Sequence, residues 1–233
     1  MILKEQLRLW ADKYNSPEYF REDPIAFPTF FAKEMAAGRS SLKDVEVAAV
    51  FAAHFAWGRR AMIVRDCSRL LHEAMGDKPY DFVMKGVCPR DPVSIHRTVK
   101  WCDVAAICDR LKHYYLNNDS LEKLSVTEIR TLIFAQKEDA KAPNKKINMM
   151  RRWMVRSDGK VDLGLWKDSD PARLVIPLDT HVYAQARALG LTGRRQKDLA
   201  TALEITAAFE EIFPGDPCKG DFALFGYGVT GGN

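Results

Sequence analysis

The 233-residue sequence predicts an all-α fold, and three observations support this prediction. Apolar residues recur at spacings of three and four along nearly the whole chain, which is the period of an amphipathic helix. Capping residues stand where several of these segments begin, and glycine stands where some of them end. No segment shows a convincing alternation of apolar and polar residues, as a half-buried strand would. The length and the 47% hydrophobic content fit one large domain or two closely packed lobes.

Four helices are predicted in the first part of the chain. The chain opens with an amphipathic helix whose apolar stripe is Leu3, Leu7, Trp10 and Tyr14. A second helix is expected over residues 24–37, with a stripe made of Phe27, Phe30, Phe31 and Met35. Ser41 and Asp44 form a variant of a capping arrangement, and the helix that follows is apolar enough to be buried on most sides. Gly58 ends it, and a further helix runs through Leu71.

Local signals also mark helix starts in the second part of the chain. Pro92 predicts the first turn of a helix that runs toward Tyr115. Ser125 and Glu128 form a capping box that opens the next helix. A last helix is expected over roughly residues 197–213.

Positive charge is concentrated in residues 137–156, and the last part of this range has the apolar spacing of a helix. Residues 137–156 carry a net charge of +5, while the chain as a whole carries +4. A confined positive stripe suits contact with a phosphate backbone, whereas a solvated helix face is the alternative. Acidic i,i+4 partners are scarce here, which weakens that alternative. The charged residues are Lys137, Lys141, Lys145, Lys146, Arg151, Arg152 and Arg156 against Glu138 and Asp139.

Cysteine usage and hydropathy exclude several classes of protein. The five cysteines include no C-x-x-C pair, so we expect reduced thiols, no metal site and no cofactor. No apolar run approaches the roughly 20 residues of a membrane span. Charges interrupt the apolar residues of the N-terminus, unlike those of a signal peptide. We therefore expect a cytoplasmic protein that does not associate with membranes.

The most informative motif is IPLDTHVYAQARALGL, residues 176–191. Pro177 and Leu178 precede Asp179, which is predicted to cap a helix over residues 180–189. The motif resembles the segment that carries the essential aspartate in the helix-hairpin-helix DNA glycosylase superfamily, and Asp-Thr-His-Val resembles in particular the 8-oxoguanine glycosylase/lyases. Over most of its length, including FAWGRR, INMMRRWMVR, VDLGLWK and DFALFGYGV, the chain is similar to a bacterial family of conserved hypothetical proteins that looks like an outlying member of this superfamily.

This resemblance implies a two-lobed fold with a central cleft, a monomer, and base excision from double-stranded DNA with a damaged base such as 8-oxoguanine. The protein would associate with the nucleoid when bound to DNA. Bifunctional members also need a lysine, and the resemblance assigns this role to Lys145, 34 residues before Asp179, with Lys146 as the alternative. The carboxylate would stabilise positive charge on the sugar, and an unprotonated amine would attack C1′ to form a Schiff base. Desolvation, neighbouring cations and a helix N-terminus each lower a lysine pKa.

The stretch QKEDAKAPNKK departs from the Leu-Pro-Gly-x-Gly hairpin of the superfamily because it contains no glycine. Phosphate contacts are therefore expected from the N-terminus of the next helix and from its basic side chains. The predicted DNA-binding residues are Lys141, Lys146, Arg151, Arg152 and Arg156.

An extruded base is usually held between aromatic or apolar side chains and hydrogen-bonded at its edges. Asp221 would accept hydrogen bonds at such an edge, and the C-terminal GDFALFGYG could fold over the pocket. Core packing is the alternative for the aromatic candidates, and a structural role is the alternative for the histidines. The candidates for base contact are His54, Trp57, Trp166, His181, Asp221 and Phe222.

Three functions remain open at this point. The first is a DNA glycosylase, bifunctional with AP-lyase activity. The second is a catalytically inactive nucleic-acid-binding protein of the same fold, which the missing glycines favour. The third is a helical protein-interaction domain, which leaves the basic segment unexplained. The sequence does not identify the base that is removed.

Overall fold

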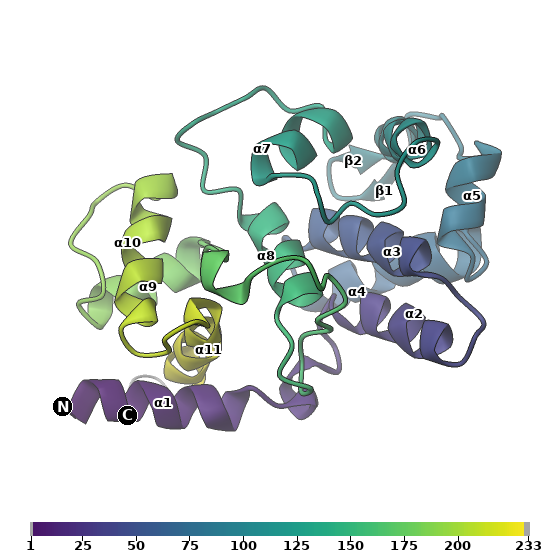
Figure 1. Ribbon diagram of the computed structural model, residues 1–233. Coiled ribbons are helices and arrows are strands. Elements are labelled where there is room, and N and C mark those ends of the chain that lie inside the picture. The colour runs from purple at the N-terminus through teal and green to yellow at the C-terminus, as the bar shows by residue number, and fades with distance from the viewer. Residues whose placement is uncertain (1, 231–233) are drawn as a thin grey trace. The chain divides into compact units, whose positions relative to one another are not determined.

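The computed structural model describes residues 2–230 and confirms the predicted all-α class (Figure 1). These residues form eleven α-helices and one two-stranded antiparallel hairpin. They divide into two compact units, which we call unit 1 (Met1–Tyr19 with Asp139–Asn233) and unit 2 (Phe20–Glu138). The central cleft stays a prediction.

Unit 1 contains the N-terminal helix and the last four helices. Its α-helices are α1 (Ile2–Tyr14), α8 (Lys145–Val155), α9 (Thr180–Ala188), α10 (Leu199–Glu210) and α11 (Gly220–Thr230). Its short helical turns are η1 (Pro17–Phe20, which ends in unit 2), η4 (Pro171–Arg173) and η5 (Pro217–Lys219).

Unit 2 contains the remaining elements. Its α-helices are α2 (Ala26–Ala36), α3 (Leu42–Phe55), α4 (Arg60–Ser68), α5 (Pro79–Lys85), α6 (Trp101–Tyr115) and α7 (Val126–Glu128). The helices α4 and α7 each continue into a π-helical segment, η2 (Arg69–Ala74) and η3 (Ile129–Ile133). The hairpin consists of β1 (Ser94–His96) and β2 (Val99–Lys100).

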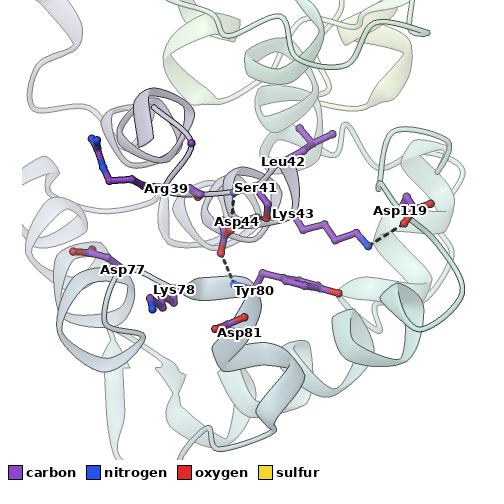
Figure 2. A pocket seen from close by; sticks show the side chains of 12 residues that line it. Arg39, Ser41, Leu42, Lys43, Asp44, Asp77, Lys78, Tyr80, Asp81 and Asp119 are labelled. Carbon is purple, nitrogen blue, oxygen red and sulfur yellow. Dashed lines mark hydrogen bonds and ion pairs between the residues drawn. The ribbon is translucent and has the colours of Figure 1, made fainter. Parts of the chain in front are cut away.

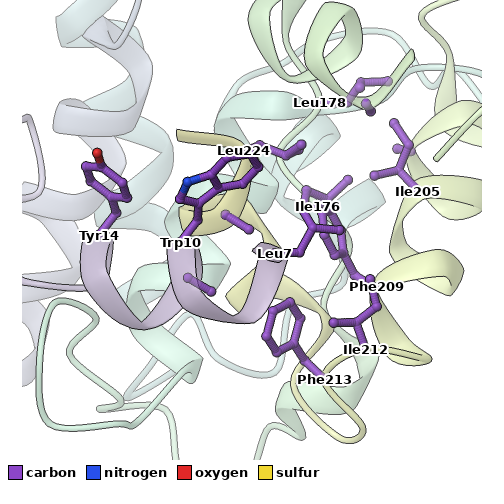
Figure 3. Close-up of a cluster of buried hydrophobic side chains, with 14 residues drawn as sticks. Leu7, Trp10, Tyr14, Ile176, Leu178, Ile205, Phe209, Ile212, Phe213 and Leu224 are labelled. Atoms are coloured by element: carbon purple, nitrogen blue, oxygen red, sulfur yellow. The ribbon is translucent and has the colours of Figure 1, made fainter. Parts of the chain in front are cut away.

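The core of unit 1 forms where α1 packs against α11, and α11 against α9 (Figures 1 and 3). Leu7, Trp10 and Tyr14 are buried, as the predicted stripe requires, but Leu3 is 40% exposed. The segment that could fold over a pocket is instead the helix α11, and its buried residues complete this core. The core side chains labelled in Figure 3 include Ile176, Leu178, Ile205, Phe209, Ile212, Phe213 and Leu224.

The core of unit 2 centres on α3, which is buried on most sides as predicted. Ser41 and Asp44 form a reciprocal capping box at its start, as expected from the sequence. The buried carboxylate of Glu46 accepts hydrogen bonds from the Tyr115 hydroxyl at 2.9 Å and from the Leu121 N–H at 3.1 Å. This compensates for the burial of a charged group inside an apolar helix.

The predicted helix start at Pro92 is wrong. The chain forms the β1–β2 hairpin there, and α6 begins only at Trp101. The carboxylate of Asp103 accepts the N–H of Lys100 at 2.8 Å, which caps α6 at this later point. Buried His96 lies in β1, and its Nδ1 is 2.7 Å from a carboxylate oxygen of Asp66, 30 residues earlier. Because Asp66 is so distant in the sequence, the residues around Pro92 contain no local signal that predicts the hairpin.

All five cysteines are free thiols, as the sequence predicted, and four of them are buried. None of the described helices is long and apolar enough to cross a membrane.

Candidate functional site

Two lysines occupy the first turn of α8. Asn144 precedes the helix in the left-handed conformation (φ 47°), and Lys145 and Lys146 are its first two residues. Burial and, to a smaller extent, the neighbouring charge of Lys145 together lower the pKa of Lys146 to about 8. The amine of Lys146 therefore loses its proton more readily than that of a solvated lysine. The sequence favoured Lys145 as the nucleophile, but the structure gives the lowered pKa to Lys146.

Asp179 is the N-cap of α9, as predicted. The extended run before it is anchored where the N–H of buried Ile176 donates to the Thr206 hydroxyl at 3.0 Å. Oδ1 of Asp179 accepts the N–H groups of His181 at 2.8 Å and Val182 at 2.9 Å. Its Oδ2 has no hydrogen-bond partner among residues 2–230. Oδ1 thus caps the helix alone, without Oδ2.

Asp221 lies within electrostatic range of both Lys145 and Asp179. It lies in the first turn of α11 and forms an ion pair with the guanidinium of Arg152. Burial raises the pKa of Asp221; the charge of Arg152 opposes this, that of Asp179 raises it further, and that of Lys145 lowers it. Both members of the predicted catalytic pair therefore act on one carboxyl group. The first turn of α8 and the cap of α9 therefore each lie within electrostatic range of the first turn of α11 in unit 1.

Arg152 and Arg156 do not fit the predicted role in phosphate contact, because both side chains are buried in ion pairs. Arg152 pairs with Asp162 at 3.2 Å. Arg156 pairs with Asp162 at 2.9 Å, with Asp158 at 2.8 Å and with Asp216 at 2.7 Å. Their side chains are only 5% and 2% exposed. We correct the prediction accordingly: these arginines hold unit 1 together.

This cluster of ion pairs was not predicted from the sequence, because its acidic residues lie outside the helix that precedes them. The partners lie in the Asp-rich loop after the helix and near α11. The loop folds back onto the end of α8, where Leu163 N–H donates to the Trp153 carbonyl at 2.7 Å and Trp166 N–H to the Met154 carbonyl at 2.8 Å. An Asp-rich loop beside a helix with unmatched arginines was the available signal.

Two predicted base contacts are core residues. Trp166 and Phe222 are 1% and 0% exposed. The Cζ atoms of Arg152 and Arg156 lie 4.8 and 5.1 Å from the Phe222 ring centroid, and that of Arg151 lies 5.9 Å from the Trp166 ring. Core packing, the alternative left open by the sequence, describes both aromatic residues, and neither presents a ring face to solvent for a base.

The remaining candidates lie in different parts of the chain. His181 and Lys141 are exposed residues of unit 1. In unit 2, the His54 ring stacks on Phe134 with centroids 5.2 Å apart. Half-buried Trp57 has the guanidinium Cζ of Arg97 4.3 Å from its ring centroid. Their roles in binding stay predictions.

A cavity of about 680 Å³ lies in unit 2 where α3 begins (Figure 2). Figure 2 shows Lys43 reaching Asp119, a pair 3.0 Å apart, and Asp44 accepting the N–H of Tyr80 at 3.0 Å. Arg39 forms an ion pair with Glu34 at 2.6 Å. None of the predicted site residues lines this cavity. Within residues 2–230, no three His, Cys, Asp or Glu side chains are grouped to hold a metal ion.

Comparison with known proteins decides the family. The family model described as "Protein of unknown function (DUF2400)" matches residues 23–133 and 126–230. The chain belongs to this family. The matched ranges include α8, Asp179 and Asp221, so the candidate site lies in the part that defines the family. No curated protein and no solved structure matches the chain.

Proposed function

We propose that this protein is a DNA glycosylase with AP-lyase activity, which removes a damaged base from double-stranded DNA. One observation carries the proposal: unit 1 combines a carboxylate at Asp179, whose Oδ2 has no hydrogen-bond partner among residues 2–230, with an amine of lowered pKa at Lys146. These two groups are the ones that glycosidic cleavage through a Schiff base requires. Such an enzyme would act as a monomer in the cytoplasm, on the nucleoid.

In the proposed reaction, Oδ2 of Asp179 faces the sugar and stabilises the positive charge that develops as the base leaves. The neutral amine of Lys146 attacks C1′ as the N-glycosidic bond breaks, and one amine proton passes to the departing base. The C1′–O4′ bond then opens, O4′ takes a proton from water, and C1′ is left joined to the lysine nitrogen as an iminium. The charge of Lys145 holds the pKa of Lys146 down, so Lys145 acts through its neighbour. This assignment reverses the order of the two lysines expected from the sequence.

The Lys146→Gln variant is expected to lose covalent trapping by borohydride on lesion-containing duplexes, because the attacking amine is gone. The matched Lys145→Gln variant should keep trapping at high pH, since the amine of Lys146 remains. The measurement is the yield of cross-linked protein on denaturing gels, across a panel of base lesions and an abasic site.

Trapping that survives Lys146→Gln and vanishes with Lys145→Gln would restore the sequence-based assignment. No trapping on any substrate, together with salt-dependent DNA binding, would instead favour the non-catalytic nucleic-acid-binding alternative. If the protein shows neither trapping nor DNA binding, the result would favour the third alternative, a protein-interaction domain.

The single-turnover rate of strand cleavage is expected to rise with pH and to level off above about 8. Only the unprotonated amine reacts, and the pKa of Lys146 is about 8. In Lys145→Gln the midpoint should move to higher pH, because the removed charge no longer disfavours the ammonium form. A wild-type midpoint that does not move in Lys145→Gln would contradict the proposed coupling.

A further inference from the structure

The loop that joins α9 to α10 (Figure 1) carries a cluster of basic residues. Residues 180–197 contain four basic side chains and no acidic one, so this segment carries +4 with histidine neutral. Three of the four lie close together in the loop, namely Arg194, Arg195 and Lys197. No role was predicted for any of them from the sequence, although the absence of acidic residues was a visible signal.

Hydrogen bonds from Arg194 and to Arg194 order this loop. The hydroxyl of Tyr183, in α9, donates to the Arg194 carbonyl at 3.0 Å. The guanidinium of Arg194 donates to the Thr201 hydroxyl at 2.9 Å and pairs with the carboxylate of Asp198 at 2.9 Å. Arg194 is therefore used within the fold, and the backbone next to it is held in place.

Arg195 and Lys197 are exposed and are not used in this way. No hydrogen bond or ion pair engages the side chain of Arg195 among residues 2–230. In the same part of the chain the ammonium of Lys197 has no carboxylate partner. Its Nζ lies 3.5 Å from the Thr180 hydroxyl, the long limit of a hydrogen bond, and 6.0 Å from the Tyr183 ring centroid. Both positive charges are thus presented to solvent on an ordered loop.

The contact with Thr180 places Lys197 at the end of α9 that Asp179 caps, because Thr180 directly follows Asp179. The N–H of Leu199 donates to the Lys141 carbonyl at 2.8 Å, so the loop also adjoins exposed Lys141. The start of a helix itself favours anions. Since the phosphates of a nucleotide are bonded to its sugar, a sugar at Asp179 would bring them to this end of α9.

We propose that Arg195 and Lys197 bind the phosphate backbone of duplex DNA, with Lys197 at a phosphate next to the nucleotide whose sugar faces Asp179. Only this last placement rests on the proposed function, because a basic loop can bind DNA whether or not a base is excised. The two side chains take the part predicted for Arg152 and Arg156, whose guanidinium groups are buried in ion pairs. A solvated surface is the usual state of such charges, but eighteen residues without a carboxylate favour a polyanionic partner.

The first test measures the affinity of the full-length protein for an undamaged duplex as a function of salt concentration. Each phosphate contact contributes about 0.9 to the slope of log K against log salt. Arg195→Ala combined with Lys197→Ala should therefore make this slope shallower by about 2, to the same extent for every duplex sequence. Thermal unfolding curves check that the double variant is folded.

Lys4→Ala combined with Arg8→Ala is the matched control, because it also removes one lysine and one arginine from exposed positions of unit 1. Lys4 pairs with Glu211 at 3.1 Å, and Arg8 donates to the Ile212 carbonyl at 3.3 Å. Both residues thus lie at the C-terminal end of α10, opposite the loop. The slope should stay close to that of the wild type. An equal change in both double variants would be an effect of net charge alone and would overturn the proposal.

The second test locates the phosphate that Lys197 contacts. The duplex contains a tetrahydrofuran analogue of an abasic site, and one flanking phosphate at a time is replaced by a neutral methylphosphonate. At one position next to the analogue, the replacement should weaken binding of the wild type and have little effect on Lys197→Ala. If every position affects both proteins equally, the placement of Lys197 is wrong.

Two further results separate this proposal from the proposed function. Duplex binding that depends on Arg195 and Lys197, without borohydride trapping on any lesion, would defeat the glycosylase and support the basic loop. Trapping with a salt slope that the double variant does not change would do the reverse. A wild-type protein that binds anionic lipid vesicles and no duplex would also overturn the proposal.

Discussion

Replacing Asp179 with Asn is expected to slow base excision by roughly 10²–10³-fold while the protein stays folded. The carboxylate supplies the negative charge that stabilises the developing cation on the sugar, and an amide cannot. The amide oxygen can still accept the N–H groups of His181 and Val182, so the N-cap survives. The measurement is single-turnover base release from the lesion that the wild type cleaves, with a thermal unfolding curve for each protein.

Asp198→Asn provides the matched control. Asp198 is also an N-cap aspartate of unit 1, and it accepts the N–H of Thr201 at 2.9 Å at the start of α10. Its replacement removes the same charge from the same kind of cap, and excision should be unchanged. If Asp179→Asn excises the base as fast as Asp198→Asn does, the carboxylate of Asp179 has no part in the chemistry.

Replacing Arg156 with Ala is expected to lower the free energy of unfolding by about 3–5 kcal/mol. The carboxylate of Asp162 is fully buried and would lose its contact with Arg156 at 2.9 Å. Burial lowers the pKa of Arg156, but the hydrogen bond to Asp216 and the charge of Asp162 outweigh it and leave that pKa raised. The carboxylates therefore favour the charged guanidinium, and they would be left short of positive charge without it. Denaturant unfolding followed by circular dichroism measures the loss.

Arg173→Ala serves as the comparison, because Arg173 pairs with Asp170 at 3.9 Å and its side chain is 88% exposed. Such a surface pair contributes about 0–1 kcal/mol, so this variant should unfold almost as the wild type does. A stable Arg156→Ala protein with weakened DNA binding would return Arg156 to the phosphate contact predicted from the sequence.

Local signals explain which elements could be predicted. The capping box of α3 and the aspartate cap of α9 involve residues two or three apart, so a short stretch of sequence contains all the interacting groups. The start of α6 was misplaced because Pro92 is compatible with a helix start, while the hairpin that forms there depends on a buried contact with Asp66.

In the candidate site, too, one feature could be predicted from the sequence and another could not. The motif around Asp179 identified a capping carboxylate, and the structure adds that one of its oxygens has no hydrogen-bond partner in the described residues. The choice between Lys145 and Lys146 could not be made from the sequence, because both occupy the first turn of one helix. The pKa of Lys146 is lowered mainly by burial, and the burial of a side chain depends on how distant segments pack, which a local stretch of sequence does not contain.

The sequence by itself determined that the chain is helical and that Asp179 caps a helix, since periodicity and capping act over one or two turns. Only the tertiary structure decided which groups pair with the arginines of the basic segment 137–156. Arg156 is neutralised there by Asp216, 60 residues away, and by Asp162 from the loop that folds back. An arginine on a helix face is drawn to phosphate or to buried carboxylate by the same attraction, and the packing of distant segments selects the partner.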